Sequence, residues 1–153
     1  MKIAFTGHRP HRLSGKEKEI AEEIYRILKI LNDTEYIEAV YSGMAQGADQ
    51  LAALQAIKIG LPLYCAYPYR RGFCPQEEYI NDAAVRIEFI SEKYSKNCFA
   101  IRDKYMVNHC DLLIAIWDGE SYGGTYETMK YAKKQGKRIL CISTKAFDSK
   151  DGE

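Results

Sequence analysis

This sequence of 153 residues has little of what marks the specialised classes of protein. Its longest strongly apolar run, residues 112–117, is far too short to cross a membrane, and its start does not resemble a secretory signal. The net charge is only +1, which does not favour wholesale binding of duplex nucleic acid. With 46% hydrophobic and 28% charged residues, the composition excludes a disordered chain, a collagen and a coiled coil, and indicates a globular protein.

Cysteine is present but follows no recognisable pattern. The five cysteines form no CxxC pair, and their odd number and wide spacing fit neither a disulfide framework nor a zinc site. Cys65, Cys110 and Cys141 lie in or beside apolar runs, where a free thiol packs as a small hydrophobe. We therefore expect a cytoplasmic protein, in a reducing compartment, with no metal and no cofactor.

Short apolar runs alternate with longer amphipathic segments along the chain. The short runs predict strands over residues 3–5, 39–41, 63–66, 86–90, 111–117 and 138–142. The amphipathic segments predict helices over residues 15–31, 48–59, 75–84, 98–109 and 124–135. Ser14 and Glu17 have the spacing of a capping box at the first helix, and Gly60 and Gly136 are placed to end two others.

Strands separated by helices predict βαβ crossovers and a parallel sheet. The fold class we expect is α/β, a single Rossmann-like doubly wound domain with helices on both faces of a mostly parallel sheet. The last two strands are continuous apolar runs, which are typical of strands covered on both faces. Because no repeat or linker divides the chain, we expect one domain over residues 1–145 and a frayed tail over residues 146–153.

Ligands of a doubly wound sheet bind beyond the carboxyl ends of its strands, so the residues that follow each strand are informative. Small residues, hydroxyls and arginines gather there. The candidate ligand-binding residues are Thr6, Gly7, His8, Arg9, Ser42, Gly43, Gly47, Asp49, Arg70, Asp118, Gly123, Gly124, Thr125 and Glu127.

Two glycine-rich turns among these residues are suited to binding phosphate. Gly43 and Gly47 precede one predicted helix, and the Gly123–Thr125 turn precedes another, where free amides and the helix dipole favour an anion. One such turn is common in any βα unit. Two of them at the same edge of the sheet favour a binding site. The guanidinium groups of nearby arginines could supply forked hydrogen-bond donors to a phosphate there, and the candidates are Arg9, Arg12, Arg70 and Arg71.

Three segments taken together resemble the YpsA-like proteins of the SLOG superfamily, which are Rossmann-like domains. The segments are FTGHRP at residues 5–10, SGxAxGAD at residues 42–49, and the stretch from DLLIA at residue 111 through DG to GGT at residue 125. The resemblance covers residues 3–142. It implies binding of a nucleotide or nucleotide-derived small molecule with no defined activity. It also implies a homodimer, for which the Tyr-rich segment 94–105 offers a helix face.

The resemblance leaves an enzymatic alternative open. Lonely-guy proteins, which are phosphoribohydrolases, and the nucleoside deoxyribosyltransferases are similar to this sequence around Gly124–Glu127, where a Gly-Thr-x-Glu pattern leads a helix. Glu127 and Arg102 are then candidate catalytic residues, since a carboxylate beside the sugar stabilises an oxocarbenium-like transition state. The turn at residues 118–122 differs from the Pro-Gly-Gly turn of those hydrolases, which favours binding without catalysis. The simpler interpretations are a helix-start glutamate and a solvated arginine.

A third alternative comes from DNA-processing protein A, which binds single-stranded DNA and shares the SGxAxG pattern of residues 42–47. A groove that follows a nucleic-acid strand needs an extended basic surface. The balanced charge of this chain offers little of that, so we expect a nucleic-acid partner least.

Overall fold

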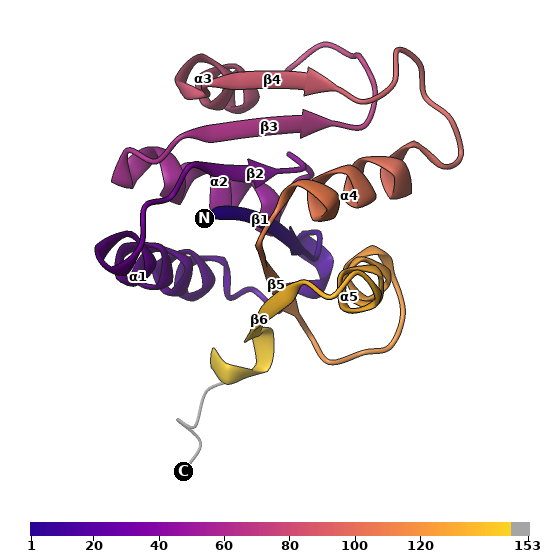
Figure 1. Cartoon of the computed structure of the whole chain (residues 1–153). Coiled ribbons are helices and arrows are strands. Elements are labelled where there is room, and N and C mark those ends of the chain that lie inside the picture. The colour runs from indigo at the N-terminus through magenta and orange to yellow at the C-terminus, as the bar shows by residue number, and fades with distance from the viewer. Residues whose placement is uncertain (148–153) are drawn as a thin grey trace.

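A computed structural model describes residues 1–147 of the chain. Its centre is a sheet of six parallel strands in the order β4-β3-β2-β1-β5-β6 (Figure 1). The strands are β1 (Lys2–Gly7), β2 (Ala39–Ser42), β3 (Leu63–Tyr67), β4 (Arg86–Phe89), β5 (Leu112–Trp117) and β6 (Arg138–Ser143). The chain builds the sheet outward from β1 to β4 and then returns to place β5 on the other side of β1. The strand order therefore reverses between β1 and β5, whose carboxyl ends lie side by side.

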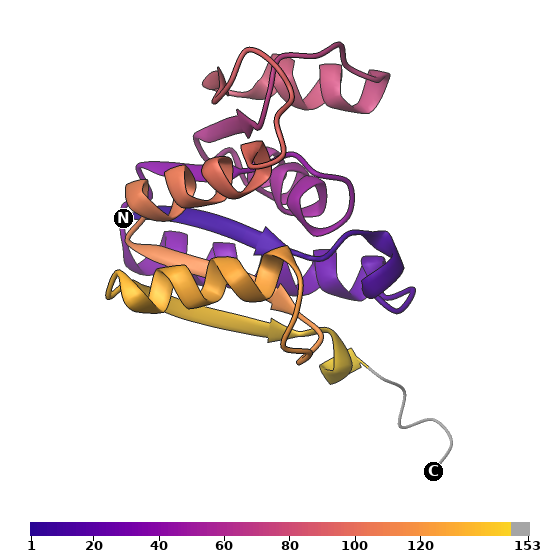
Figure 2. The ribbon, with the colours of Figure 1, turned by 90° about the vertical axis from the view of Figure 1, so that its right-hand side faces the viewer.

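Helices cover both faces of this sheet, as expected for a doubly wound fold (Figure 2). The helices are α1 (Glu17–Thr34), α2 (Ala48–Ile59), α3 (Pro75–Ala83), α4 (Cys98–His109) and α5 (Gly124–Lys134), with short 3-10 turns at Pro10–Arg12 and Thr144–Phe147. α1, α2 and α3 pack on one face, and α4 and α5 pack on the other. The predicted α/β, Rossmann-like fold class is confirmed.

Two apolar clusters fill the spaces between the sheet and its helices. Ile3 and Phe5 of β1 point toward the α1 and α2 side, whereas Ala4 between them points toward α4 and α5. This follows from the alternation of side chains along a strand. Because both faces are covered, β1 and β5 are buried along almost their whole length.

Most of the predicted elements are confirmed, and α2 and α4 have the predicted bounds. Gly60 ends α2 in the left-handed conformation, with φ 89°, as its position predicts. The capping box at α1 is wrong. Ser14 itself adopts a positive φ of 57° inside a turn, and the helix begins only at Glu17. Ser14 is therefore too far from the free amides of the helix to cap them.

The expectation that both of the last two strands are covered on both faces is half wrong. β5 is central and buried, but β6 pairs only with β5 and forms an edge of the sheet. Arg138 and Cys141 are consequently exposed on β6. Cys65 and Cys110 are buried as expected, whereas Cys141 is not. An apolar run does not distinguish a central strand from an edge strand, because that difference depends on what lies beside it.

The end of the described chain falls inside the segment expected to be a tail. Ala146 and Phe147 belong to the last 3-10 turn, and residues 148–153 lie outside the described residues. None of the helices in residues 1–147 has the length and apolar character needed to span a membrane.

Candidate functional site

A cavity of about 410 Å³ opens where β1 and β5 end, at the reversal of strand order. The end of β1, the start of α2, the first half of α4 and the start of α5 all contribute to its wall. The lining residues are Thr6, Gly7, His8, Arg9, His11, Arg12, Ala45, Asp49, Phe99, Arg102, Asp103, Tyr122, Gly123, Gly124 and Thr125. We call this space the first cavity, and it lies where doubly wound sheets bind ligands.

A second cavity of about 370 Å³ lies beside the first, toward the ends of β2 and β3. It is lined by Arg9, Gly43, Met44, Ala45, Gln46, Pro68, Tyr69, Arg71, Cys74, Glu77, Phe99 and Arg102. Four of these residues, Arg9, Ala45, Phe99 and Arg102, also line the first cavity. The two cavities therefore share a wall.

The structure brings most of the predicted site residues together. Those that line the first cavity are Thr6, Gly7, His8, Arg9, Asp49, Gly123, Gly124 and Thr125, together with the candidate Arg102. Gly43 lines the second cavity. The two glycine-rich turns face one cleft with Arg9, since Ala45 of the first turn and all of the second turn line the same cavity.

Ser42 and Gly47 line neither cavity but fix the conformation of the loop before α2. The hydroxyl of Ser42 donates to the Asp49 carbonyl at 2.8 Å and accepts from the Met44 amide at 3.2 Å. Met44 has a positive φ of 61°, a costly conformation for a side chain of its kind. At Gly47, with φ 97°, an added Cβ would lie 2.5 Å from the carbonyl oxygen of His8. Only glycine lets this loop pack so closely against the end of β1.

Asp49 is a buried carboxyl in the wall of the first cavity. It accepts a hydrogen bond of 3.3 Å from the Ala45 amide. Burial raises the pKa of Asp49 to about 6, which the charge of Arg102 opposes and that of Asp103 reinforces. A Cβ added at Gly43 would lie 2.9 Å from both the Arg102 guanidinium and the Asp49 carboxylate, so a side chain here would displace one of these two groups.

Arg102 is not the solvated helix residue of the simpler interpretation, because it is only 5% exposed. Its Nη1 donates to the Gly43 carbonyl, and its Nε donates to the Asp103 carboxylate at 2.7 Å. The other oxygen of Asp103 lies 3.2 Å from the Thr128 hydroxyl, which also lies 2.7 Å from the Gly124 carbonyl. Arg102 thus joins α4 to the loop after β2, and Asp103 joins α4 to α5.

Asp118 and Arg12 hold two loops of the site together. Both Nε and Nη2 of Arg12 lie 2.7 Å from the Asp118 carboxylate, and Nη1 donates to the Tyr122 carbonyl at 3.0 Å. The Arg12 guanidinium holds the pKa of Asp118 well below its usual range. Burial lowers the pKa of His8, whose Nε2 lies 3.1 Å from both the amide nitrogen and a carboxylate oxygen of Asp118. These groups tie the site together and are already partnered.

Arg70 and Glu127 lie outside both cavities. Arg70 donates to Glu92 at 2.8 Å and stacks 4.2 Å from the Phe89 ring, while its neighbour Arg71 points into the second cavity. The side chain of Glu127 is 66% exposed and lies 3.9 Å from Lys130, beside a separate groove between α4 and α5. Two residues along a helix turn by about 200°, so Thr125 faces the first cavity and Glu127 faces away from it.

Sequence reasoning missed Phe99 and Asp103. Phe99 lies in the shared wall of the two cavities, with the guanidinium carbons of Arg9 and Arg102 at 5.6 and 5.9 Å from its ring centre. A phenylalanine on an amphipathic helix usually indicates only a core residue, so the sequence carried no signal for this role. Asp103 could have been noticed as the acidic neighbour of the candidate Arg102.

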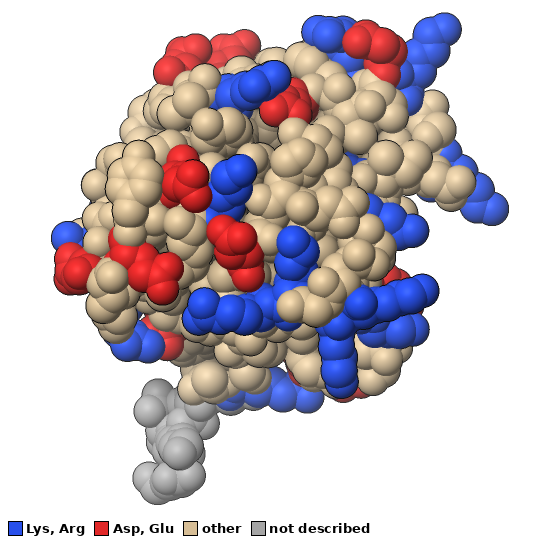
Figure 3. Space-filling model, in the orientation of Figure 1, with Lys and Arg blue, Asp and Glu red and all other residues tan. Residues whose placement is uncertain are grey.

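Charge and metal-binding capacity limit what this site can hold. Arg9 forms no ion pair with any of residues 1–147. Figure 3 shows Lys and Arg side chains gathered over α5 and along the edge to which β3 and β4 point. Within the described part of the chain, no group of three His, Cys, Asp or Glu side chains is close enough to hold a metal ion. Of these observations, the Arg9 side chain without an ion-pair partner is the one that favours an anion.

Neither a protein-family model nor a curated protein matches this sequence. Three solved structures share its fold. DNA processing protein A from Streptococcus pneumoniae has a TM-score of 0.73 at 19% identity, over 92% of this chain and 50% of that one. DNA processing protein A from Helicobacter pylori, described for its single-stranded DNA binding mode, has a TM-score of 0.60 at 20% identity. That match covers 92% of this chain and 64% of the H. pylori chain. The structural genomics target TM1055 has a TM-score of 0.64 at 15% identity, and the match covers 90% of this chain and 71% of the TM1055 chain.

At these identities the similarity shows the fold alone. The chain spans half the length of the pneumococcal protein and slightly less than two thirds of the H. pylori protein. The shared fold agrees with the Rossmann-like architecture that the sequence predicts.

Proposed function

We propose that this protein is a YpsA-like member of the SLOG superfamily that binds a nucleotide or nucleotide-derived small molecule in the first cavity. The observation that carries the proposal is that the start of α5 and the Arg9 side chain face the same cavity. Together they offer positive potential to one anionic group from two sides.

The start of α5 is the part of the cavity best suited to a phosphate. Among residues 1–147, no side chain caps the first amides of α5, which follow Gly123. Apart from its two chain neighbours and the backbone of its own helix, no described residue has an atom within 4 Å of the position that a Cβ would take at Gly124, so this side of the backbone is open to a ligand. Thr125, buried in the cavity wall, adds a hydroxyl donor. Asp49 and Asp103 in the same wall are acceptors suited to sugar hydroxyls.

N-glycosidic cleavage is the weaker candidate, because the carboxylate assigned to it, that of Glu127, lies outside the first cavity. Binding of single-stranded nucleic acid is the second candidate, favoured by the fold shared with the H. pylori protein and by the exposed lysines Lys130, Lys133 and Lys134 on α5. We further propose a cytoplasmic homodimer. Light scattering should then give a mass near twice the 17.5 kDa of one chain.

The test is calorimetric titration of the full chain with nucleoside mono-, di- and triphosphates and with a single-stranded oligonucleotide. We expect a nucleotide to bind. Gly124→Val should weaken binding by about tenfold or more because its side chain fills the space that the phosphate needs, and Arg9→Ala by a similar factor because it removes a phosphate contact. Gly72→Val and Arg70→Ala are matched controls, because Gly72 also has open space and Arg70 lies outside both cavities. Binding of the oligonucleotide alone would favour the second candidate and contradict the proposal.

A further inference from the structure

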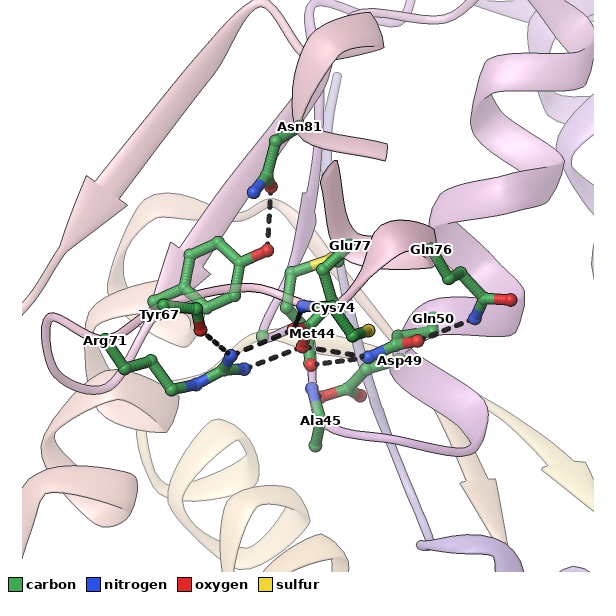
Figure 4. Close-up of polar contacts among 12 residues, drawn as sticks. Met44, Ala45, Asp49, Gln50, Tyr67, Arg71, Cys74, Gln76, Glu77 and Asn81 are labelled. Atoms are coloured by element: carbon green, nitrogen blue, oxygen red, sulfur yellow. Dashed lines mark hydrogen bonds and ion pairs between the residues drawn. The ribbon is translucent and has the colours of Figure 1, made fainter. Parts of the chain in front are cut away.

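The second cavity has a chemistry different from that of the first. Its floor is formed by Arg71 and Glu77, and Arg71 donates to both oxygens of Glu77, at 2.9 and 2.7 Å (Figure 4). Outside the cavity lining, Gln50 donates to the Met44 carbonyl at 3.1 Å and accepts from Gln76 at 2.7 Å. Glu77 is buried, and its charge is matched by that of Arg71. A phosphate would have to compete with Glu77 for this arginine, so the second cavity is poorly suited to an anion.

Aromatic side chains form the walls above this floor. Tyr69 and Phe99 both line the second cavity, with ring centres 6.3 Å apart and planes nearly perpendicular. The Arg71 guanidinium lies 5.0 Å from the ring centre of Tyr67, which keeps that cation against the floor. A neutral floor with aromatic walls is the environment in which a flat, uncharged ring packs favourably.

The free positive charge lies between the two cavities. Arg9 is in the shared wall and has only the ring of Phe99 as a cation–π partner among residues 1–147. Arg102, also in the shared wall, already donates to Gly43 and Asp103. An anionic group near Arg9 would therefore have one cavity on each side of it.

The sizes of the two cavities agree with a ligand that has one part in each cavity. Binding sites for drug-sized ligands occupy roughly 300–1,000 Å³. Either cavity alone, at about 410 or 370 Å³, is near the lower end of that range. A nucleoside monophosphate would be accommodated in the first cavity and would leave the second one unused.

We infer that the ligand is a diphosphate with a ring system at each end, which spans both cavities. This inference rests on the proposed function and specifies its ligand class. One ring system and the phosphate at the start of α5 occupy the first cavity. The second phosphate lies at Arg9, and the second ring packs against the Tyr69 and Phe99 rings, over the Arg71–Glu77 pair.

The test compares three probes by calorimetry with the full chain: the nucleoside monophosphate that binds best, its diphosphate, and the dinucleoside diphosphate built from the same nucleoside. We expect the dinucleoside diphosphate to bind at least about tenfold more tightly than the diphosphate. Gln46→Trp should remove this gain and leave the affinity for the monophosphate unchanged, because Gln46 is exposed and lines the second cavity alone. Gln135→Trp, at an exposed position at the end of α5, is the matched control.

Tyr69→Ala is a second variant that removes a wall without filling the cavity, and it too should abolish the gain. Equal affinities of the wild-type chain for the diphosphate and the dinucleoside diphosphate would overturn the inference and leave the proposed function standing. A gain that survives in both Gln46→Trp and Tyr69→Ala would also overturn it. If no probe binds to the wild-type chain, the proposed function fails and takes the inference with it.

Discussion

Arg12 and Asp118 form a forked ion pair, with Nε and Nη2 of the arginine each 2.7 Å from a carboxylate oxygen, across 106 positions of the chain. Arg12 follows β1 and Asp118 follows β5, so the pair fastens together the two strand ends between which the sheet order reverses. Both side chains are largely buried. The first cavity lies directly beside this pair, and its shape depends on it.

Replacing Asp118 with Asn should destabilise the protein. The amide keeps one acceptor but turns an N–H group toward Arg12. The free energy of unfolding should therefore fall by about 2 kcal/mol at pH 7. Because Arg12 lowers the pKa of Asp118, the stability that this carboxylate adds is present above the usual pKa of aspartate and is lost as the pH falls below it. Urea unfolding at pH 7 and pH 3 measures both effects. Asp33→Asn, at an exposed position on α1, should change neither.

Asp49→Asn should have the opposite effect on stability. Burial raises the pKa of Asp49 from 3.8 to about 6, so the charged form is penalised in the folded state and stability is lost as the pH rises through that value. The asparagine removes the penalty, so unfolding at pH 8 should require up to about 3 kcal/mol more than in the wild type. At pH 4 the two proteins should differ little. A less stable variant at pH 8 would show that the carboxylate makes a compensating contact.

The same carboxyl should give phosphate binding a pH dependence. Above pH 6 the charged Asp49 repels an anion in the first cavity, and below it the neutral form does not. At pH 8 we expect Asp49→Asn to bind a nucleoside monophosphate about tenfold more tightly than the wild type, and at pH 5 about equally. The comparison at each pH cancels the titration of the phosphate itself. Equal affinities at pH 8 would place the phosphate away from Asp49.

Thr125 and Glu127 should respond differently to substitution although they are two residues apart. Thr125→Val removes a hydroxyl from the first cavity and should weaken nucleotide binding by about 0.5–1.5 kcal/mol. Glu127→Gln, outside that cavity, should change the affinity by less than about twofold. Calorimetry of both variants checks this. A release of free base from a nucleoside monophosphate that falls about 100-fold in Glu127→Gln would instead support the N-glycosidase.

Local patterns in the sequence were sufficient for much of this fold. Apolar runs and helical periodicity gave α2 and α4 their bounds, because these features depend on neighbours a few residues apart. Glycines after β1, β2 and β5 could be placed at one edge, because all strands of a parallel sheet end on the same side. The meeting of Arg9 with the Gly123–Thr125 turn followed from this rule alone.

Tertiary structure alone decided which residues the cleft uses. Arg71 lines the second cavity and Arg70 does not, because Arg70 is bound by Glu92 and Arg71 by Glu77. Neither glutamate can be identified as a partner from a local sequence pattern. Glu127 is excluded by the orientation of α5, and Phe99 enters the site because α4 begins beside the carboxyl ends of the central strands. Edge strands, buried carboxyls and shared cavity walls arise from contacts between residues far apart in the chain, whereas sequence periodicity reports only on those close together.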